Sequence, residues 1–255
     1  MSDLPSSFFG WVGFILQKYG SLFLNGVGVT LAVAITGTVL GFLLGLLVAI
    51  LRTIPIPPRA KWYQRVPIKV LYAVLGVYIE VFRGTPMIVQ AMVIYYGGMQ
   101  MGMRLPVLTA AILIVSINTG AYMAEIIRGG IISVDKGQKE AAHAIGMTHW
   151  QSMVYVVLPQ AVRNILPALG NEFIMILKET SLASTFFLGD LMTSQKIVAG
   201  ATYLQLETLI IVGSIYLCIT FPLSKLVGWF ETKMSTDKSY KKRNRQRKLM
   251  WGGKI

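Results

Sequence analysis

Long stretches without a charged residue limit most strongly how this chain can fold. Residues 19–51, 84–103 and 105–124 contain no Asp, Glu, Lys or Arg, and a helix of about 20 apolar residues crosses the ~30 Å hydrocarbon core of a bilayer. Charged residues make up only 14% of the 255 residues, compared with roughly 25% in a typical soluble domain. We therefore predict an all-α membrane protein.

Basic residues predict the topology, because Lys and Arg in short loops mark the cytoplasmic side of a membrane. They gather in residues 52–69, in residues 128–163 and in the tail from Lys233 onward. If all three segments are cytoplasmic, an even number of crossings separates each from the next. The result is a multi-pass protein of the cell membrane with about five spans, its N-terminus outside and its C-terminus cytoplasmic. The predicted spans are 20–51, 70–98, 106–127, 161–178 and 206–230.

The second predicted span is too long for one straight helix. Residues 70–98 would rise about 43 Å as an α-helix, so this span must tilt, kink or begin on the membrane surface. The sequence supplies a kink at "RGTP", residues 83–86, where Pro86 removes a helix hydrogen bond and Gly84 loosens the backbone. Polar groups freed there could line a cavity, and a purely structural kink fits equally well.

The two ends of the chain flank a predicted transmembrane domain of residues 20–232. Residues 1–19 contain the aromatic "FFGWVGFIL" without a basic segment or a cleavage pattern, which favours an extracytoplasmic interfacial helix over a cleaved signal. Residues 233–255 form a basic tail, which favours contact with anionic lipid over binding of nucleic acid. The net charge of +13 then reflects topology, and no nucleic acid partner is expected.

Two features of the spans concern packing. Gly37, Gly41 and Gly45 repeat every four residues and would let another helix approach closely. That helix could belong to the same chain or to a second subunit. The only cysteine, Cys218, cannot form an intrachain disulfide, and we expect a packed thiol.

The sequence lacks the motifs of common catalytic sites. It has no GxxxxGK(S/T) phosphate loop, no HExxH helix, no GxSxG elbow and no clustered cysteines. Glu140, His143 and His149 come nearest to a metal-binding set, but polar residues on a solvated loop are the more common arrangement. We therefore expect neither enzymatic activity nor a metal or cofactor in this chain.

Residues 129–160 form a cytoplasmic connection that looks too long and too ordered for a simple turn. The local signals, in order, are an N-cap pair (Asp135, Gln138), a left-handed helix end (Gly146), a capping box (Thr148, Gln151) and a closing proline (Pro159). They predict a helix, a glycine corner and a second helix. A DNA-binding helix-turn-helix uses the same pattern, but a loop tethered at both ends to membrane spans is poorly placed to read DNA.

The segment "EAAHAIG" at 140–146, followed nine residues later by "VVLP", resembles the EAA motif of permease subunits of ABC importers. That motif reads EAA, three residues, Gly, nine residues, Ile, one residue, Leu-Pro, and Val156 stands here at the Ile position. Three further segments resemble the polar amino-acid branch of the family, the histidine, glutamine and arginine type: "EVFRGTPMIVQ" at 80–90, "NTGAYMAEIIRGGIISVDKGQKEAA" at 118–142 and "LPQAVRNILPALGNEFIMILKETSL" at 158–182. The similarity covers nearly the whole chain except its two ends.

The resemblance implies a type I ABC importer permease fold within a larger complex. Two permease subunits, either two copies of this chain or this chain with a similar one, would sit on two ATPase subunits that bind ATP and Mg. An extracytoplasmic binding protein would deliver the amino acid. The EAA loop would form the coupling helix that enters a groove on the ATPase, a role that carries over to Glu140, Ala141, Ala142 and Gly146. The chain itself would be a non-catalytic subunit.

Polar side chains within the spans are candidates for the substrate path, because such groups are costly in a membrane. The candidates are Glu80, Arg83, Thr85, Asn118, Tyr122, Asn171 and Glu172. Counting about 1.5 Å per residue from the predicted membrane faces puts both glutamates and both asparagines near mid-bilayer. Glu125 and Arg128 fall near the cytoplasmic edge, where they could simply pair with each other.

A self-contained secondary carrier or channel without an ATPase is the alternative. A secondary carrier would more often show paired inverted repeats and around ten or more spans in one chain, whereas this sequence predicts five spans and shows no evident repeat. A membrane scaffold without cargo would leave the buried carboxylates unexplained. Glu80 and Glu172 would favour the amine of any amino acid, so the sequence identifies neither the cargo nor the second permease.

Overall fold

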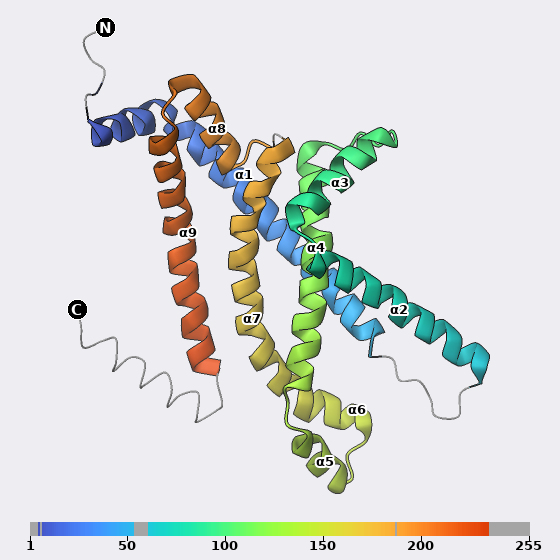
Figure 1. Cartoon of the computed structure of the whole chain (residues 1–255). Coiled ribbons are helices and arrows are strands. Elements are labelled where there is room, and N and C mark those ends of the chain that lie inside the picture. Colours follow the sequence, from blue (N-terminus) through green and yellow to red (C-terminus); the bar gives the residue numbers. More distant parts are fainter. Residues whose placement is uncertain (1–4, 6, 54–60, 187, 235–255) are drawn as a thin grey trace. The chain divides into compact units, whose positions relative to one another are not determined.

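A computed structural model describes residues 5, 7–53, 61–186 and 188–234, so most of the basic tail lies outside the described residues. Nearly all of the described chain is helical (Figure 1). In chain order the elements are α1 (Phe8–Leu51), α2 (Trp62–Gly84), α3 (Met87–Gln100), α4 (Val107–Ile132), α5 (Lys136–Ala144), α6 (His149–Ser152), the π-helix η1 (Met153–Val157), α7 (Leu158–Glu179), the 3-10 helix η2 (Thr180–Phe186), α8 (Leu191–Thr202) and α9 (Gln205–Met234). They form two compact units. Of the described residues, those within 1–125 and 172–221 form the first unit, and those within 126–171 and 222–255 form the second.

Four helical segments of the described chain are long and apolar enough to cross a membrane: Phe8–Leu51, Val107–Ile132, His149–Phe186 and Gln205–Met234. The predicted span 70–98 is missing from this set and consists of two helices, of which α3 has 14 residues. Helix α2 ends at Gly84, Thr85 is extended with φ −122° and ψ 150°, and Pro86 begins α3. The expected break at "RGTP" is confirmed, since proline lacks an N–H and keeps the preceding residue out of the helical region.

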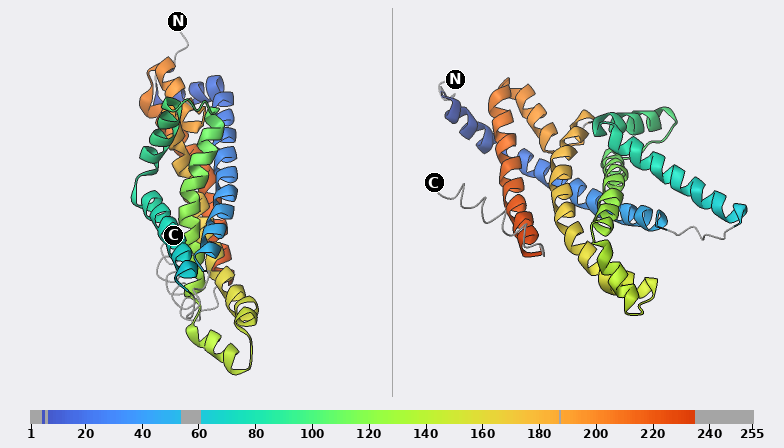
Figure 2. Two further views of the ribbon diagram at one scale, coloured as in Figure 1. Left: turned by 90° about the vertical axis from the view of Figure 1, so that its right-hand side faces the viewer. Right: turned by 60° about the horizontal axis from the view of Figure 1, so that its bottom comes forward.

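The repeated glycines Gly37, Gly41 and Gly45 form a ridge on α1 that packs against α4 within the first unit. A Cβ added at Gly41 would lie 2.6 Å from Cβ of Thr119, and one at Gly45 would lie 2.8 Å from both the Ala124 nitrogen and the Gly120 oxygen. Contacts this short show that the backbones of the two helices nearly touch, and Figure 2 shows the helices side by side. The ridge therefore serves packing within one chain, which decides between the two possibilities that the sequence left open.

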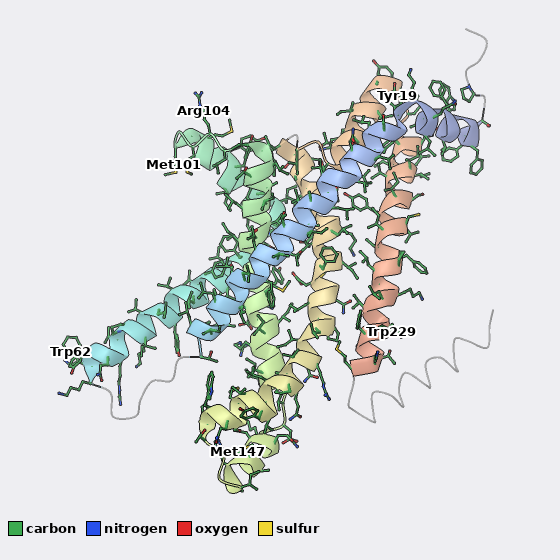
Figure 3. The ribbon with its side chains drawn as sticks, turned by 180° about the vertical axis from the view of Figure 1, so that it is seen from behind. Tyr19, Trp62, Met101, Arg104, Met147 and Trp229 are labelled. Carbon is green, nitrogen blue, oxygen red and sulfur yellow. The ribbon has the colours of Figure 1, made fainter. Side chains whose placement is uncertain are left out.

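The first half of α1 packs against α8 and α9. The buried core there contains six residues, Ile15, Phe23, Leu191, Val198, Ile211 and Val212. Ser194 donates from Oγ to the Leu22 carbonyl oxygen at 3.2 Å, and the Leu191 N–H donates to Oγ1 of Thr30 at 3.2 Å. Helix α1 runs from Phe8 to Leu51 without interruption and turns near Tyr19 (Figure 3). An interfacial location for residues 1–19 stays a prediction.

Cys218 is exposed on α9, so the expectation of a packed thiol is wrong. The buried positions of α9 are Thr208, Ile211 and Val212, all in the first turns of the helix. Cys218 lies beyond them, where the helix no longer contributes to the core with α1 and α8.

The second unit contains the predicted helix, glycine corner and helix. Asp135 begins α5 by accepting the Gly137 N–H at 2.7 Å, and Thr148 forms a capping box with Gln151 at the start of α6. Between the helices Gly146 has φ +85°. Its N–H donates to the His143 oxygen, and the following Met147 N–H donates to the Ala142 oxygen, the two bonds of a Schellman motif. These predicted helix boundaries are confirmed, and Figure 3 marks the corner at Met147.

Pro159 does not end this unit, contrary to the expectation from the sequence. It is the second residue of α7, and the chain passes from α6 through η1 into α7 without leaving helical geometry. In η1 the Leu158 N–H donates to the Met153 oxygen, five residues earlier. A widened turn of this kind shifts the hydrogen-bond ladder at the point where proline has no N–H to donate, so the helix continues through Pro159.

Candidate functional site

A buried amide network fastens the break between α2 and α3 to α4. Gln90 donates from Nε2 to the Phe82 carbonyl oxygen at 3.0 Å, and to the carbonyl oxygen and Oγ1 of Thr85 at 2.9 and 2.7 Å. Asn118 donates from Nδ2 to Oε1 of Gln90 at 2.8 Å and to the Phe82 oxygen at 3.3 Å. The last carbonyls of a helix have no intrahelical donor. Here the side-chain amides of Gln90 and Asn118 donate to the carbonyl oxygens of Phe82 and Thr85. We call these four residues the break network.

Arg83 lies at the same break and faces α4. Its Nη1 is 3.8 Å from Oε2 of Glu125, and its guanidinium carbon is 5.6 Å from the centre of the Tyr122 ring, within cation–π range. Arg52, at the end of α1, donates from Nη1 to Oε1 of Glu125 at 3.1 Å. Asn118, Tyr122 and Glu125 share one face of α4, being four and three residues apart.

Glu172 of α7 adds a buried carboxylate. Its exposed fraction is 9%, and it interacts electrostatically with Glu179 and Arg83. Arg83 is thus the residue that relates two other predicted path residues, because it lies over the Tyr122 ring and interacts electrostatically with Glu172. We call Arg83, Tyr122 and Glu172 the cluster. Ionisable groups inside membrane helices are candidates for a functional site.

Two predicted path residues have exposed side chains. Glu80 is exposed on α2, and Asn171 is exposed on α7 in the second unit. The predicted pairing of Glu125 with Arg128 stays a prediction, whereas the contacts of Glu125 with Arg52 and Arg83 were not foreseen.

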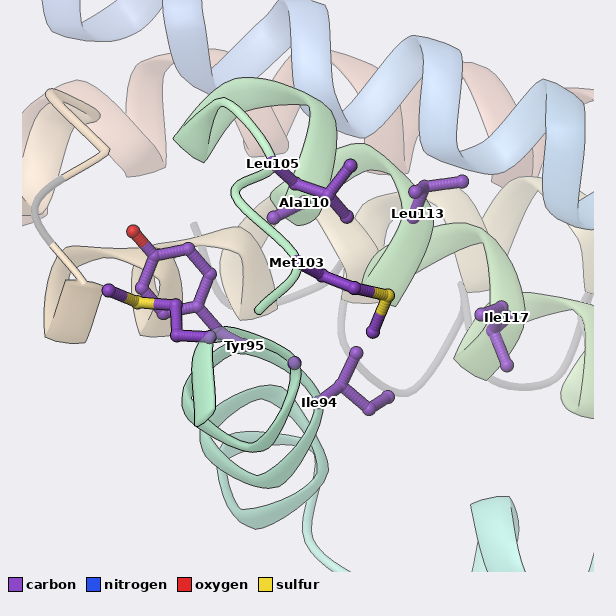
Figure 4. A pocket seen from close by; sticks show the side chains of 9 residues that line it. Ile94, Tyr95, Met103, Leu105, Ala110, Leu113 and Ile117 are labelled. Atoms are coloured by element: carbon purple, nitrogen blue, oxygen red, sulfur yellow. The ribbon is translucent and has the colours of Figure 1, made fainter. Parts of the chain in front are cut away.

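An apolar pocket of about 100 Å³ lies between α3 and α4 (Figure 4). It is lined by Ile94, Tyr95, Gly98, Met99, Met103, Leu105, Ala110, Leu113 and Ile117. The Tyr95 ring stacks on Phe186 with the ring centres 4.9 Å apart. A charged group would lose its hydration there without gaining a charged partner, so this pocket suits a hydrocarbon group better than a polar ligand.

Most of the residues assigned to coupling are exposed on the EAA loop, which comprises residues 129–160. Glu140, Ala141 and Gly146 are exposed, whereas Ala142 is buried at 4%. Large apolar side chains are also exposed on this loop, with Ile145 at 78% and Trp150 at 73%. The rings of His143 and His149 stack with centres 6.2 Å apart. Among the described residues no three His, Cys, Asp or Glu side chains are grouped as a metal site would need.

Comparison with known proteins identifies the family. Residues 62–236 match the family described as "Binding-protein-dependent transport system inner membrane component". The chain belongs to this family. The resemblance to ABC importer permeases is confirmed, and the chain is a permease subunit of an ABC transporter and a multi-pass membrane protein.

Several curated permeases resemble this one over most of their length. The "Arginine transport system permease protein ArtQ" of Bacillus subtilis is 35% identical over 84% of this chain and 93% of its own. The "Glutamine transport system permease protein GlnP" of Escherichia coli is 37% identical with the same coverage. The "Nopaline transport system permease protein NocM" of Agrobacterium fabrum is 38% identical over 84% of this chain and 87% of its own.

Solved structures resemble the permease in fold. The structure described as "an amino acid ABC transporter with histidines" matches with a TM-score of 0.79 and 43% identity, over 86% of this chain and 97% of that chain. An inward-facing MetNI methionine ABC transporter matches with a TM-score of 0.60 over 82% of this chain and 96% of that chain. Its identity is 21%, so it supports the type I importer permease fold alone.

Two residues that support the candidate site, Gln90 and Arg52, were not predicted from the sequence. Gln90 is a polar residue inside the uncharged stretch 84–103, which was a usable signal because buried amides need partners. Arg52 was assigned only to the basic loop after the first span. Nothing local indicated its carboxylate partner, which lies 73 residues away.

Proposed function

We propose that this permease forms the translocation path for a polar amino acid in an ATP-driven importer. The amino acid is delivered by an extracytoplasmic binding protein, and ATP and Mg are bound and ATP is hydrolysed by partner subunits. The relatives named for arginine, glutamine and nopaline transport support a cargo that carries both an amine and a carboxylate.

The observation that carries this proposal is the cluster of Arg83, Tyr122 and Glu172. A guanidinium pairs well with a carboxylate, and a carboxylate pairs well with an ammonium group. Arg83 is near both the Tyr122 ring and Glu125, and it interacts electrostatically with Glu172. The cluster therefore offers both charges that an amino acid needs, at a break in the helix where polar groups are tolerated in a membrane.

Coupling to the ATPase is assigned to the EAA loop. Its two short helices are fixed by the Schellman motif at Gly146 and the capping box at Thr148, so the loop keeps a defined shape. Exposed Ile145 and Trp150 add an apolar surface of the kind that anchors protein interfaces. This loop would enter a groove of the ATPase, with Glu140, Ala141, Ala142 and Gly146 at the contact.

The proposed assembly contains two permeases, two ATPase subunits and the binding protein in the cell membrane. The second permease is either another copy of this chain or a similar chain. The N-terminus lies outside and the C-terminus is cytoplasmic, as the distribution of Lys and Arg indicates.

Two measurements test the function. The permease is purified from its native membrane in detergent, and we expect an ATPase subunit to co-purify in stoichiometric amount. The complex is then reconstituted in vesicles with its binding protein and given a panel of radiolabelled amino acids that includes L-arginine, L-histidine, L-glutamine and L-cystine. We expect ATP-dependent uptake of at least one of them. Uptake that proceeds without the ATPase would instead favour a secondary carrier or a channel.

A further inference from the structure

Asn118 and Thr85 are predicted path residues, but their side chains are hydrogen-bonded within the break network rather than available to a cargo. Both Nδ2 hydrogens of Asn118 are engaged, by Gln90 and by the Phe82 carbonyl oxygen. Oγ1 of Thr85 accepts from Gln90 and donates to the Val81 oxygen at 2.7 Å. These groups hold the chain at the break, and Gln90 is the residue that joins them.

Gln90 is suited to this task by its burial. Its exposed fraction is 7%, and that of Asn118 is 4%. Hydrocarbon offers no water to replace a lost donor, so the carbonyl oxygens of the break depend on these side chains. Gln90 also connects three elements, because it lies on α3, donates to the end of α2 and accepts from α4.

The residue that this arrangement fixes is Arg83. It directly follows Phe82, whose carbonyl oxygen receives both amides. The contacts of Arg83 lie further along the same face of α4, at Tyr122 and Glu125. The break network therefore sets where the Arg83 backbone stands, and the arginine reaches the cluster from that position.

We propose that Gln90 is a positioning residue for transport, which holds the break against α4 so that Arg83 faces Tyr122 and Glu125. This inference rests on the proposed function, since it concerns the rate at which cargo passes the cluster. Gln90 itself touches no cargo in this scheme. Its effect on transport passes through Arg83.

The test compares Gln90→Met with Gln195→Met in the reconstituted complex. Methionine keeps the length of the side chain and removes its hydrogen bonds. Gln195 is a matched control because it is also buried, at 0%, and donates between helices, from Nε2 to Oγ1 of Thr208 at 2.9 Å, but has no part in the break network. Uptake of radiolabelled L-arginine and L-glutamine is measured at saturating binding protein, beside ATP hydrolysis in the absence of binding protein.

We expect Gln90→Met to lower the maximal uptake rate about tenfold while basal hydrolysis stays within about twofold, and Gln195→Met to change neither by more than about twofold. In an Arg83→Met background, Gln90→Met should lower uptake by less than about twofold further, because two residues that act through one contact are not additive. A tenfold additional loss in that background, or equal uptake rates for Gln90→Met and Gln195→Met, would overturn the proposal.

Two further results distinguish a failure of the inference about Gln90 from a failure of the variant to fold and from a failure of the proposed function. Gln90→Asn keeps the amide but shortens the side chain, so it is the milder variant if the methionine variant does not fold. We expect it to lower uptake about threefold, and a wild-type rate would count against the inference. If the unaltered complex itself transports none of the amino acids of the panel, the proposed function fails, irrespective of Gln90.

Discussion

The Glu125 carboxylate forms ion pairs with two arginines that are distant from it in the sequence. Arg52 lies 3.1 Å from Oε1, and Arg83 lies 3.8 Å from Oε2. An isolated charge in a membrane helix is costly, and pairing lowers that cost when both oxygens find a partner. Three charged side chains can therefore lie within the first unit, and Arg83 is held beside the Tyr122 ring.

Glu172 is the predicted path residue whose chemistry is simplest to test. Glu172→Gln keeps the size of the side chain and removes its charge. We expect uptake at saturating binding protein to fall by roughly ten- to a hundredfold, equivalent to ~1–3 kcal/mol for the loss of a charge-assisted partner, while assembly with the ATPase is retained. Glu207→Gln, in the first turn of α9, is the control. Normal uptake by Glu172→Gln at normal expression would remove Glu172 from the path.

Gly45 makes the tightest backbone contact between α1 and α4, and Gly28 on the same helix has open space around it. Gly45→Ala should destabilise the fold by ~1–3 kcal/mol, because neither helix backbone can yield easily. Gly28→Ala should be neutral or stabilise by up to ~1 kcal/mol through helix propensity. Thermal unfolding of both variants in detergent measures the difference. Equal unfolding temperatures would show that the contact between the helices is looser than described.

At the scale of elements, the features that the sequence predicted correctly are set by neighbouring residues. The corner at Gly146 and the break at Pro86 depend on a glycine that permits positive φ and a proline that lacks an N–H. Long-range partners were not predictable in this way. The contact between Gln90 and Asn118 spans 28 residues, and no local signal says which buried amides will meet.

The π-helix η1 shows a different reason for a wrong prediction. Pro159 is a reasonable end signal taken alone. Proline has no N–H and needs no acceptor, and the helix from α6 passes through the widened turn into α7 without interruption. Whether a chain bypasses a proline in this way depends on packing around the turn, which a single sequence does not reveal.

The EAA loop yields a prediction about coupling. Gly146→Val places a β-branched side chain at φ +85°, which costs on the order of 1–2 kcal/mol and turns the helix away from its partner. Glu140→Lys reverses an exposed charge at the proposed contact. We expect both variants to insert normally and to lose either the ATPase subunits or the stimulation of ATP hydrolysis by loaded binding protein.

Gly213→Val is the matched control, since Gly213 lies on α9 with open space around it. It should keep wild-type stimulation in the reconstituted complex. Wild-type stimulation in the two loop variants as well would mean that residues 129–160 merely connect two spans.

At the scale of the whole molecule, hydropathy and family agree on a multi-pass permease, but the helices differ from the predicted spans. The described chain has four segments that could each cross a membrane, and the second predicted span, 70–98, is the broken pair α2 and α3. The predicted N-terminal segment and first span are joined in one helix, α1. Composition alone locates apolar stretches, and it does not show where a helix bends or stops.

The predicted orientation can be tested by thiol labelling in intact cells. In a Cys218→Ser background, Met101→Cys lies between α3 and α4, where the native side chain is 81% exposed, and should react with an impermeant maleimide from outside. His149→Cys, on the EAA loop, should react only after the membrane is permeabilised. The opposite pattern would invert the topology, because both assignments depend on the same distribution of Lys and Arg.

The glycine contact between α1 and α4 has a mechanical consequence. Where two backbones touch without an intervening layer of side chains, one helix cannot slide along the other without first lifting away from it. Helix α1 and the part of α4 beside it should therefore move as one rigid body, so that Arg52, Tyr122 and Glu125 keep their positions relative to one another.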